Sequence, residues 1–224
     1  MFPARLPGLG STPGSAVILI YFIIGALLVG WLSGGRIERL ADVRIRWAGA
    51  AICGLLAQVV LFSPPVTGWV GQAGPPLYVV SCVVVLAAVL RNLGRPGIVL
   101  LAVGAALNAT VIAANGGYMP VAPDALSTLG RPAPTGVYGN TSTAGPGTLL
   151  PWLGDVVAVP PPIPLANAIS IGDVLIGLGA AVFVVRTMRT AGGAPAGISA
   201  HPADGPDGPG GAPPPPMTGE AARG

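Results

Sequence analysis

The chain has 224 residues, of which 52 % are hydrophobic and 8 % are charged, and its formal net charge is +3. Soluble domains carry roughly a quarter charged residues, so this composition excludes an ordinary soluble domain and predicts an integral membrane protein with several spans. The eleven basic residues are all arginines scattered between apolar runs, which argues against a nucleic-acid-binding surface. The bias toward arginine, alanine, glycine and proline is typical of a GC-rich bacterial genome. We therefore expect the lipid bilayer as a partner and no nucleic acid.

Five apolar runs predict transmembrane helices. Crossing about 30 Å of hydrocarbon takes about 20 helical residues, with about 17 as the lower limit. The runs cover residues 16–33, 47–63, 75–90, 98–115 and 165–185. The third run is marginal in length, and whether it spans fully stays open. A signal peptide is the alternative for the first run, but a single arginine precedes it and no A-x-A cleavage site follows. The expected fold class is an all-α integral membrane protein with about five transmembrane helices.

The arginines alternate between the connecting segments and set the orientation. Residues 64–74 carry no charge, and residues 116–164 contain Arg131 as their one arginine. The positive-inside rule then predicts a multi-pass protein of the bacterial inner membrane, with residues 1–15 outside and the C-terminus in the cytoplasm. The arginines of the three cytoplasmic segments are Arg36, Arg39, Arg44, Arg46, Arg91, Arg95, Arg186 and Arg189.

The long outer loop begins with "NGGYMPV" and later contains "LLPWLGDVVAVPPPIP". Gly116 and Gly117 predict a glycine cap at the end of the fourth helix, and Met119–Pro120 predicts an extended exit. The second stretch, interrupted by Asp155, is too short for a span and predicts an interfacial or re-entrant segment. Trp152 suits the aromatic belt at the level of the lipid headgroups.

The membrane domain of residues 16–190 is followed by a tail of residues 191–224 that is rich in glycine, proline and alanine. It lacks aromatic residues, so we expect it to be disordered. The lone histidine, His201, lies in this tail, and Cys53 and Cys82 lie within spans. That inventory excludes a metal site built on histidine or cysteine and a Ser-His-Asp triad. We expect no metal and no cofactor.

Polar side chains inside spans are costly and face a neighbouring helix or a cavity. Gln58 and Asn108 lie in mid-span, and we expect a polar cluster in the outer half of the membrane. Interhelical hydrogen bonding is one interpretation of these groups, and a ligand or catalytic site is the other. The cluster residues on the outer half are Asn115, Asp155, Asn167, Ser170 and Asp173.

Ser170 and Asp173 also match a helix capping box. A helix beginning at Ile171 leaves only about 22 Å to Val185, which is too short to span. A helix beginning near Asn167 spans better but places Asp173 in the second turn, beyond the reach of a cap. Both accounts stay open at this stage.

The motifs "NGGYMPV", "LGD" and "SIGDVLI" resemble those of a family of uncharacterised bacterial membrane proteins, over roughly residues 16–189. This resemblance implies an integral membrane protein and no particular activity. A looser similarity is to lipoprotein signal peptidases, in which one aspartate lies in a loop and a second enters the last helix. Asp155 and Asp173 follow that order, but Ser170 stands where the family's Asn-x-x-Asp has its carboxylate.

The sequence therefore predicts an inner-membrane protein of unknown biochemical role with a polar cluster near the outer face. One alternative is an intramembrane aspartyl hydrolase that uses Asp155 and Asp173 as catalytic residues. Another is a carrier or transporter subunit with Asp173 as its protonatable site. Five spans give no inverted repeat, so a carrier would need a homo-oligomer or another membrane protein as partner.

Overall fold

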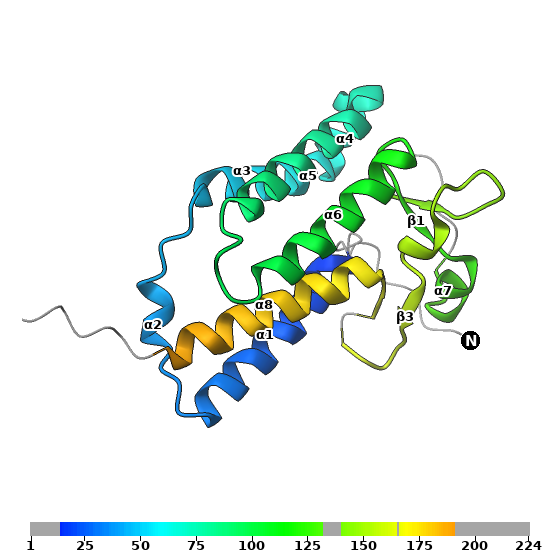
Figure 1. Ribbon diagram of the computed structural model, residues 1–224. Helices are drawn as coiled ribbons and strands as arrows, with labels where there is room; N and C mark the ends of the chain where they lie inside the picture. Colours follow the sequence, from blue (N-terminus) through cyan, green and yellow to red (C-terminus); the bar gives the residue numbers. More distant parts are fainter. Residues whose placement is uncertain (1–13, 132–139, 165, 191–224) are drawn as a thin grey trace, which may run out of the picture. The chain divides into compact units, whose positions relative to one another are not determined.

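The computed structural model describes residues 14–131, 140–164 and 166–190; the tail of residues 191–224, with His201, lies outside the described residues. The described part is mostly helical (Figure 1). The helices are α1 (Gly14–Leu32), α2 (Glu38–Ala41), α3 (Ala48–Leu61), α4 (Pro64–Val70), α5 (Gly74–Leu90), α6 (Ile98–Ala114), α7 (Pro123–Thr128) and α8 (Ile171–Arg189), with 3-10 turns η1 (Gly71–Ala73) and η2 (Pro151–Leu153). The strands are β1 (Met119–Val121), β2 (Thr141–Thr143), β3 (Val157–Val159) and β4 (Asn167–Ile169).

The first four predicted runs form α1, α3, α5 and α6, with ends within two residues of those expected. Two helical stretches in the described part are long and apolar enough to cross a membrane, Gly68–Leu90 and Ile171–Arg189. The first joins the end of α4, η1 and α5, so the run that was marginal in the sequence is lengthened by the turns before it. The described parts of α1, α3 and α6 are apolar but shorter.

The fifth helix begins later than predicted. Residues 167–169 form β4, and α8 starts at Ile171, directly after the N-cap residue Ser170. The starts predicted at residue 165 and near Asn167 are therefore wrong. The length objection to a start at Ile171 fails because the helix continues past Val185 to Arg189, and its 19 residues rise about 28 Å.

Helix α8 lies between α1 and α6, while α3 packs against α5 and α5 against α6 (Figure 1). Helices α6 and α8 approach closely because glycines stand at their crossing. A Cβ atom on Gly104 would overlap the carbonyl oxygen of Gly172, and one on Gly179 would lie 2.5 Å from the backbone nitrogen of Leu101. Small residues at such crossings are how membrane helices gain van der Waals contact.

A layer of short strands and turns follows α6. The Asn115–Gly117 segment ends α6 as predicted: Gly116 and Gly117 have φ angles of 66° and 91°, and the Gly117 N–H donates to the Ile112 carbonyl at 2.8 Å. Met119 then enters β1, which pairs in parallel with β2, while β3 pairs antiparallel with β4. The segment expected to be interfacial or re-entrant contains η2 and β3, and Trp152 in η2 is 66 % exposed.

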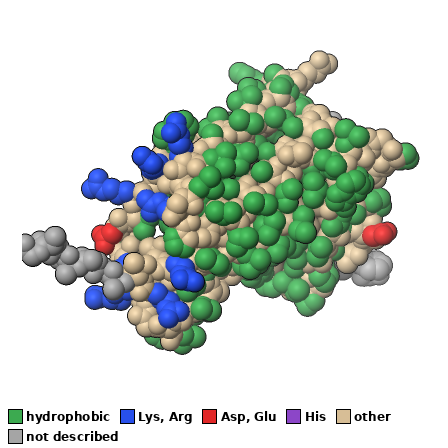
Figure 2. All heavy atoms as spheres, viewed as in Figure 1, with side chains coloured by type: hydrophobic (Ala, Val, Ile, Leu, Met, Phe, Trp, Pro, Cys, Tyr) green, Lys and Arg blue, Asp and Glu red, His purple; other side chains and the backbone are tan. Residues whose placement is uncertain are grey.

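Large apolar side chains are exposed along the helices. Leu32 is 76 % exposed, Val59 67 % and Leu56 57 %, whereas buried apolar side chains such as Val111 and Met188 are fewer. Cys53, which lies within the second predicted span, is also exposed. Figure 2 shows hydrophobic side chains over the middle of the visible face and arginines gathered at one end. Large exposed apolar side chains in such number are unfavourable in water and are typical of a surface that contacts another apolar phase or molecule.

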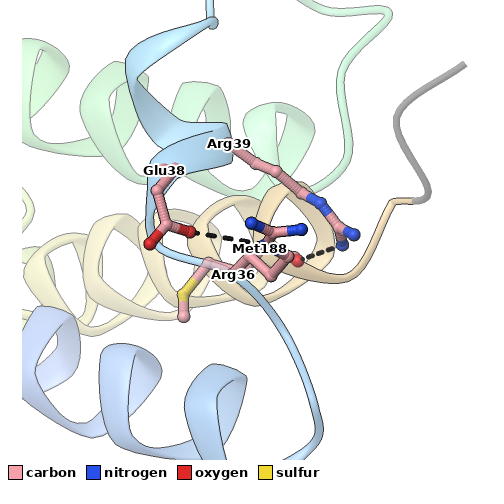
Figure 3. A network of polar contacts seen from close by, with 4 residues as sticks. All are labelled: Arg36, Glu38, Arg39 and Met188. Carbon is pink, nitrogen blue, oxygen red and sulfur yellow. Dashed lines mark hydrogen bonds and ion pairs between the residues drawn. The ribbon is translucent and has the colours of Figure 1, made fainter. Parts of the chain in front are cut away.

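The C-terminal end of α8 is held by arginines (Figure 3). The Met188 carbonyl accepts hydrogen bonds from the Arg39 guanidinium at 2.7 Å and from the Arg36 N–H at 2.9 Å. Arg36 also lies 3.6 Å from Glu38 in an exposed ion pair. Positive charge at a helix C-terminus is stabilising because the last carbonyls carry partial negative charge.

Candidate functional site

The N-terminus of α8 is built by the capping box that the sequence contains. The Ser170 hydroxyl accepts a hydrogen bond from the Asp173 N–H at 3.0 Å, and Asp173 Oδ2 accepts one from the Ser170 N–H at 3.1 Å. Both side chains are buried, with 0 % and 2 % exposure. The carboxylate therefore satisfies a helix-end donor and also faces the positive end of the helix dipole.

Asn108 on α6 completes this arrangement from the neighbouring helix. Its Nδ2 donates to Asp173 Oδ1 at 2.7 Å, and its Oδ1 accepts from the Ser170 hydroxyl at 2.9 Å. Gly172 makes the approach possible, because a Cβ atom there would overlap Asn108 Oδ1. Asn108, Ser170 and Asp173 thus form a closed hydrogen-bonded triad in which each oxygen of the Asp173 carboxylate has a donor.

Asp155 is placed by its backbone. Its N–H donates to the Pro120 carbonyl at 2.8 Å and its own carbonyl accepts from the Ala122 N–H at 3.0 Å, so it pairs as an isolated bridge beside Val121 of β1. The preceding Gly154 packs against the Pro120 carbonyl with no room for a Cβ atom. These contacts fix a residue of the long outer loop against the layer that follows α6.

The side chain of Asp155 is the unusual group of this region. It is 6 % exposed, and its buried Oδ1 has no hydrogen-bond partner within the part of the chain that the structure describes. Burial raises the pKa of Asp155 well above its ordinary value of 3.8, and the negative charge of Asp173 raises it further. A buried carboxyl group without a cation is favoured in its neutral, protonated form because the charged form has lost its hydration.

The other predicted cluster residues have different partners. Asn167 Oδ1 accepts from Arg131 Nη1 at 2.9 Å. Asn115 exchanges two hydrogen bonds with the backbone of Leu149, each 2.9 Å, and so holds the end of α6 to the outer loop. Gln58 lies 3.7 Å from the sulfur of Cys82, between α3 and α5.

Among the seven predicted residues, the structure therefore joins Asn108, Ser170 and Asp173 by hydrogen bonds and adds Asp155 by electrostatic interaction. Asn115 directly follows the last residue of α6 and bonds to Leu149, so it lies outside this hydrogen-bonded group.

Sequence reasoning did not assign a role to Arg131. Its guanidinium also donates to the Ala166 carbonyl at 2.9 Å, so it anchors the segment that leads into β4. The sequence did contain one indication of such a role, because Arg131 is the one arginine of residues 116–164.

Acid–base chemistry is what this arrangement can supply. The described residues contain no group of three or more histidine, cysteine, aspartate or glutamate side chains that could hold a metal ion. One carboxyl group, Asp155, has an oxygen that accepts no hydrogen bond from any residue the structure describes. The other, Asp173, has its oxygens occupied by donors from Asn108 and Ser170.

Comparison with known proteins gives a family and no activity. Neither the curated proteins nor the solved structures include a match. A model of a family of unknown function, DUF5317, matches residues 42–185. This range includes Asn108, Asp155, Ser170 and Asp173, and it supports the expected uncharacterised family but not the likeness to signal peptidases. Because the match covers more than half of the sequence, the chain belongs to the DUF5317 family of unknown function.

Proposed function

We propose that this chain is a five-span protein of the bacterial inner membrane that binds a proton at Asp155, near the outer face. The single observation that carries the proposal is the buried Asp155 carboxyl group, whose Oδ1 has no hydrogen-bond partner among the described residues, beside the charge of Asp173. Perturbed carboxyl groups of this kind gather at functional sites. Proton binding at Asp155 is coupled to the packing of the short-strand layer that follows α6. If Asp155 ionises in its buried position, a second negative charge lies near Asp173 and opposes that packing.

The alternation of arginine-rich connections with connections that hold one arginine or none supports the five-span topology. Arginines gather at one end of the visible face and apolar side chains lie beside them, which agrees with this topology (Figure 2). Reporter fusions after Arg46, Arg95 and Arg189 should report the cytoplasm, and a fusion at Thr141 should report the outside. An external signal after Arg189 would overturn the topology.

The pH dependence of stability tests proton binding at Asp155. A carboxyl group whose pKa is raised in the folded state binds more protons there than in the unfolded chain, over the window between the two pKa values. Its contribution is therefore fully present below the ordinary value of 3.8 and is lost as the pH rises through the raised pKa. We expect the melting temperature in detergent to fall as the pH rises, and Asp155→Asn to remove most of that fall.

Asp124→Asn is the matched control, because Asp124 is an exposed aspartate at the start of α7. That variant should keep the pH dependence of the unaltered chain. Parallel curves for the unaltered chain and Asp155→Asn would contradict proton binding at this residue.

The aspartyl hydrolase is the second candidate, favoured by the electrostatic interaction between the two carboxyl groups. It requires both groups to act on water, whereas each oxygen of Asp173 already accepts a hydrogen bond from the protein. In a deletion strain with a measurable phenotype, a hydrolase predicts the same complete loss for Asp155→Asn and Asp173→Asn. The proton-binding role predicts that Asp155→Glu, which keeps a titratable group, restores function that Asp155→Asn lacks.

A further inference from the structure

A groove of about 610 Å³ runs along the contact between α1 and α8. Its lining is apolar except for Tyr21 and Arg186. The two helices are parallel in this region, since Phe22 lies against Gly177 and Gly30 against Met188. The α1 side of the groove runs from Ile18 to Val29, a rise of about 16 Å.

The two ends of the groove differ in chemistry. The Tyr21 hydroxyl donates to the Pro164 carbonyl at the end near the outer loop. Arg186 lies at the other end, in the last turn of α8, and is exposed. Within the described residues the Arg186 guanidinium forms no ion pair, and the one ion pair found there joins Arg36 to Glu38. The groove thus combines an apolar wall with an uncompensated cation at its arginine-rich end.

We infer that this groove binds an anionic phospholipid of the cytoplasmic leaflet, with an acyl chain along α1 and α8 and the phosphate at Arg186. The inference rests on the membrane topology proposed above. Charge complementarity selects the occupant, because arginine donors match phosphate oxygens and basic sites at the cytoplasmic side of membrane helices bind anionic headgroups. An acyl chain matches the wall, since eight of the ten lining residues are apolar.

Gly25 lies in the lining and allows a direct test. A Cβ atom added to Gly25 would have no protein atom within 4 Å, so the space beside it is open. Gly25→Leu should therefore occupy the groove without disturbing the packing of α1 on α8. Gly49→Leu is the matched control, because Gly49 lies on α3, away from the groove, and also has nothing within 4 Å of an added Cβ atom.

Arg186→Gln removes the proposed phosphate donor, and Arg189→Gln removes the same charge from the same helix end but outside the lining. The full chain, purified in detergent, would be mixed with phosphatidylglycerol or with phosphatidylcholine of the same acyl chains, and retained lipid counted by native mass spectrometry. We expect phosphatidylglycerol to be retained in preference to phosphatidylcholine. Arg186→Gln should weaken that retention about fivefold, the effect of one arginine near an anionic surface, and Gly25→Leu should abolish retention of both lipids.

Both controls should retain phosphatidylglycerol as the unaltered chain does. Equal retention by all five proteins, or equal loss in Arg189→Gln and Arg186→Gln, would overturn the groove site in favour of nonspecific lipid around the helices. A chain that does not remain with membranes during carbonate extraction would refute the membrane topology itself. A chain that remains in membranes but shows no lipid preference would refute only the lipid site.

Discussion

The two ends of α8 are stabilised by opposite means. At the N-terminus the backbone N–H donors are bonded by the buried side chains of Ser170 and Asp173. Asn108 on α6 donates to Asp173 from the neighbouring helix. At the C-terminus the Met188 carbonyl is met by Arg39 and by the backbone of Arg36, beside an exposed ion pair. Both arrangements complement the helix dipole. The difference teaches that the fully buried N-terminal end is costly to disturb, whereas the C-terminal end, with a partly buried arginine contact and an exposed ion pair, is adjustable.

The largest expected effect comes from removing the amide that joins α6 to the buried end. Asn108→Leu removes the hydrogen bonds that Asn108 makes with Asp173 Oδ1 and with the Ser170 hydroxyl. Losing a buried hydrogen bond to a charged group lowers the free energy of unfolding by about 2–3 kcal/mol. Gln58→Leu is the matched change, because Gln58 has only a 3.7 Å contact to the Cys82 sulfur. Thermal unfolding in detergent should show a clear loss for Asn108→Leu and less than about 1 kcal/mol for Gln58→Leu. Similar losses for both would mean that the triad is no more than ordinary interhelical hydrogen bonding.

An intermediate effect is expected for Asp173→Asn. The neutral side chain keeps one acceptor for the Ser170 N–H but loses the interaction of its charge with the helix end, about 0.3–1 kcal/mol, and part of the cap, about 1 kcal/mol. It also removes the charge that raises the pKa of Asp155. The fall in melting temperature with rising pH should therefore be smaller and should end at a lower pH in this variant. An unchanged pH profile would show that the two carboxyl groups do not interact.

The smallest effect is expected at the C-terminal end of α8. Arg39→Gln removes a charged donor to the Met188 carbonyl, while the Arg36 N–H continues to donate to the same oxygen. The loss should be about 0.5 kcal/mol and should shrink in high salt, because the Arg39 guanidinium is only partly buried and its interaction with the helix dipole is screened. A loss as large as that of Asn108→Leu, or one independent of salt, would remove the distinction between the two ends.

Much of the helical framework could be predicted from the sequence, because apolar runs flanked by glycine, proline and arginine have few other interpretations. The ends of α3, α5 and α6 follow from such signals. The start of α8 could not be settled, because the same residues fit a longer helix and a capped shorter one. The capping box decided it, aided by a helix that continues past Val185 to Arg189.

The site was predictable in its residue types but not in its pairing. Asp155 and Asp173 stood out as carboxyl groups in apolar stretches, and the structure makes them electrostatic neighbours. That Asn108 rather than Asn115 contacts Asp173 depends on where α6 crosses α8. That crossing is set by Gly104 and Gly172, and spacing along one helix carries no information about it.

Infrared spectroscopy of the purified chain tests the central claim most directly, because a protonated carboxylic acid and a carboxylate absorb at different carbonyl frequencies. At a pH above the ordinary aspartate pKa of 3.8 we expect the band of a buried protonated carboxylic acid in the unaltered chain and in Asp124→Asn, and its loss in Asp155→Asn. Raising the pH should convert that band to carboxylate as Asp155 ionises. A spectrum without a protonated carboxyl band above pH 3.8, or one in which Asp155→Asn leaves the band unchanged, would contradict a proton bound at Asp155.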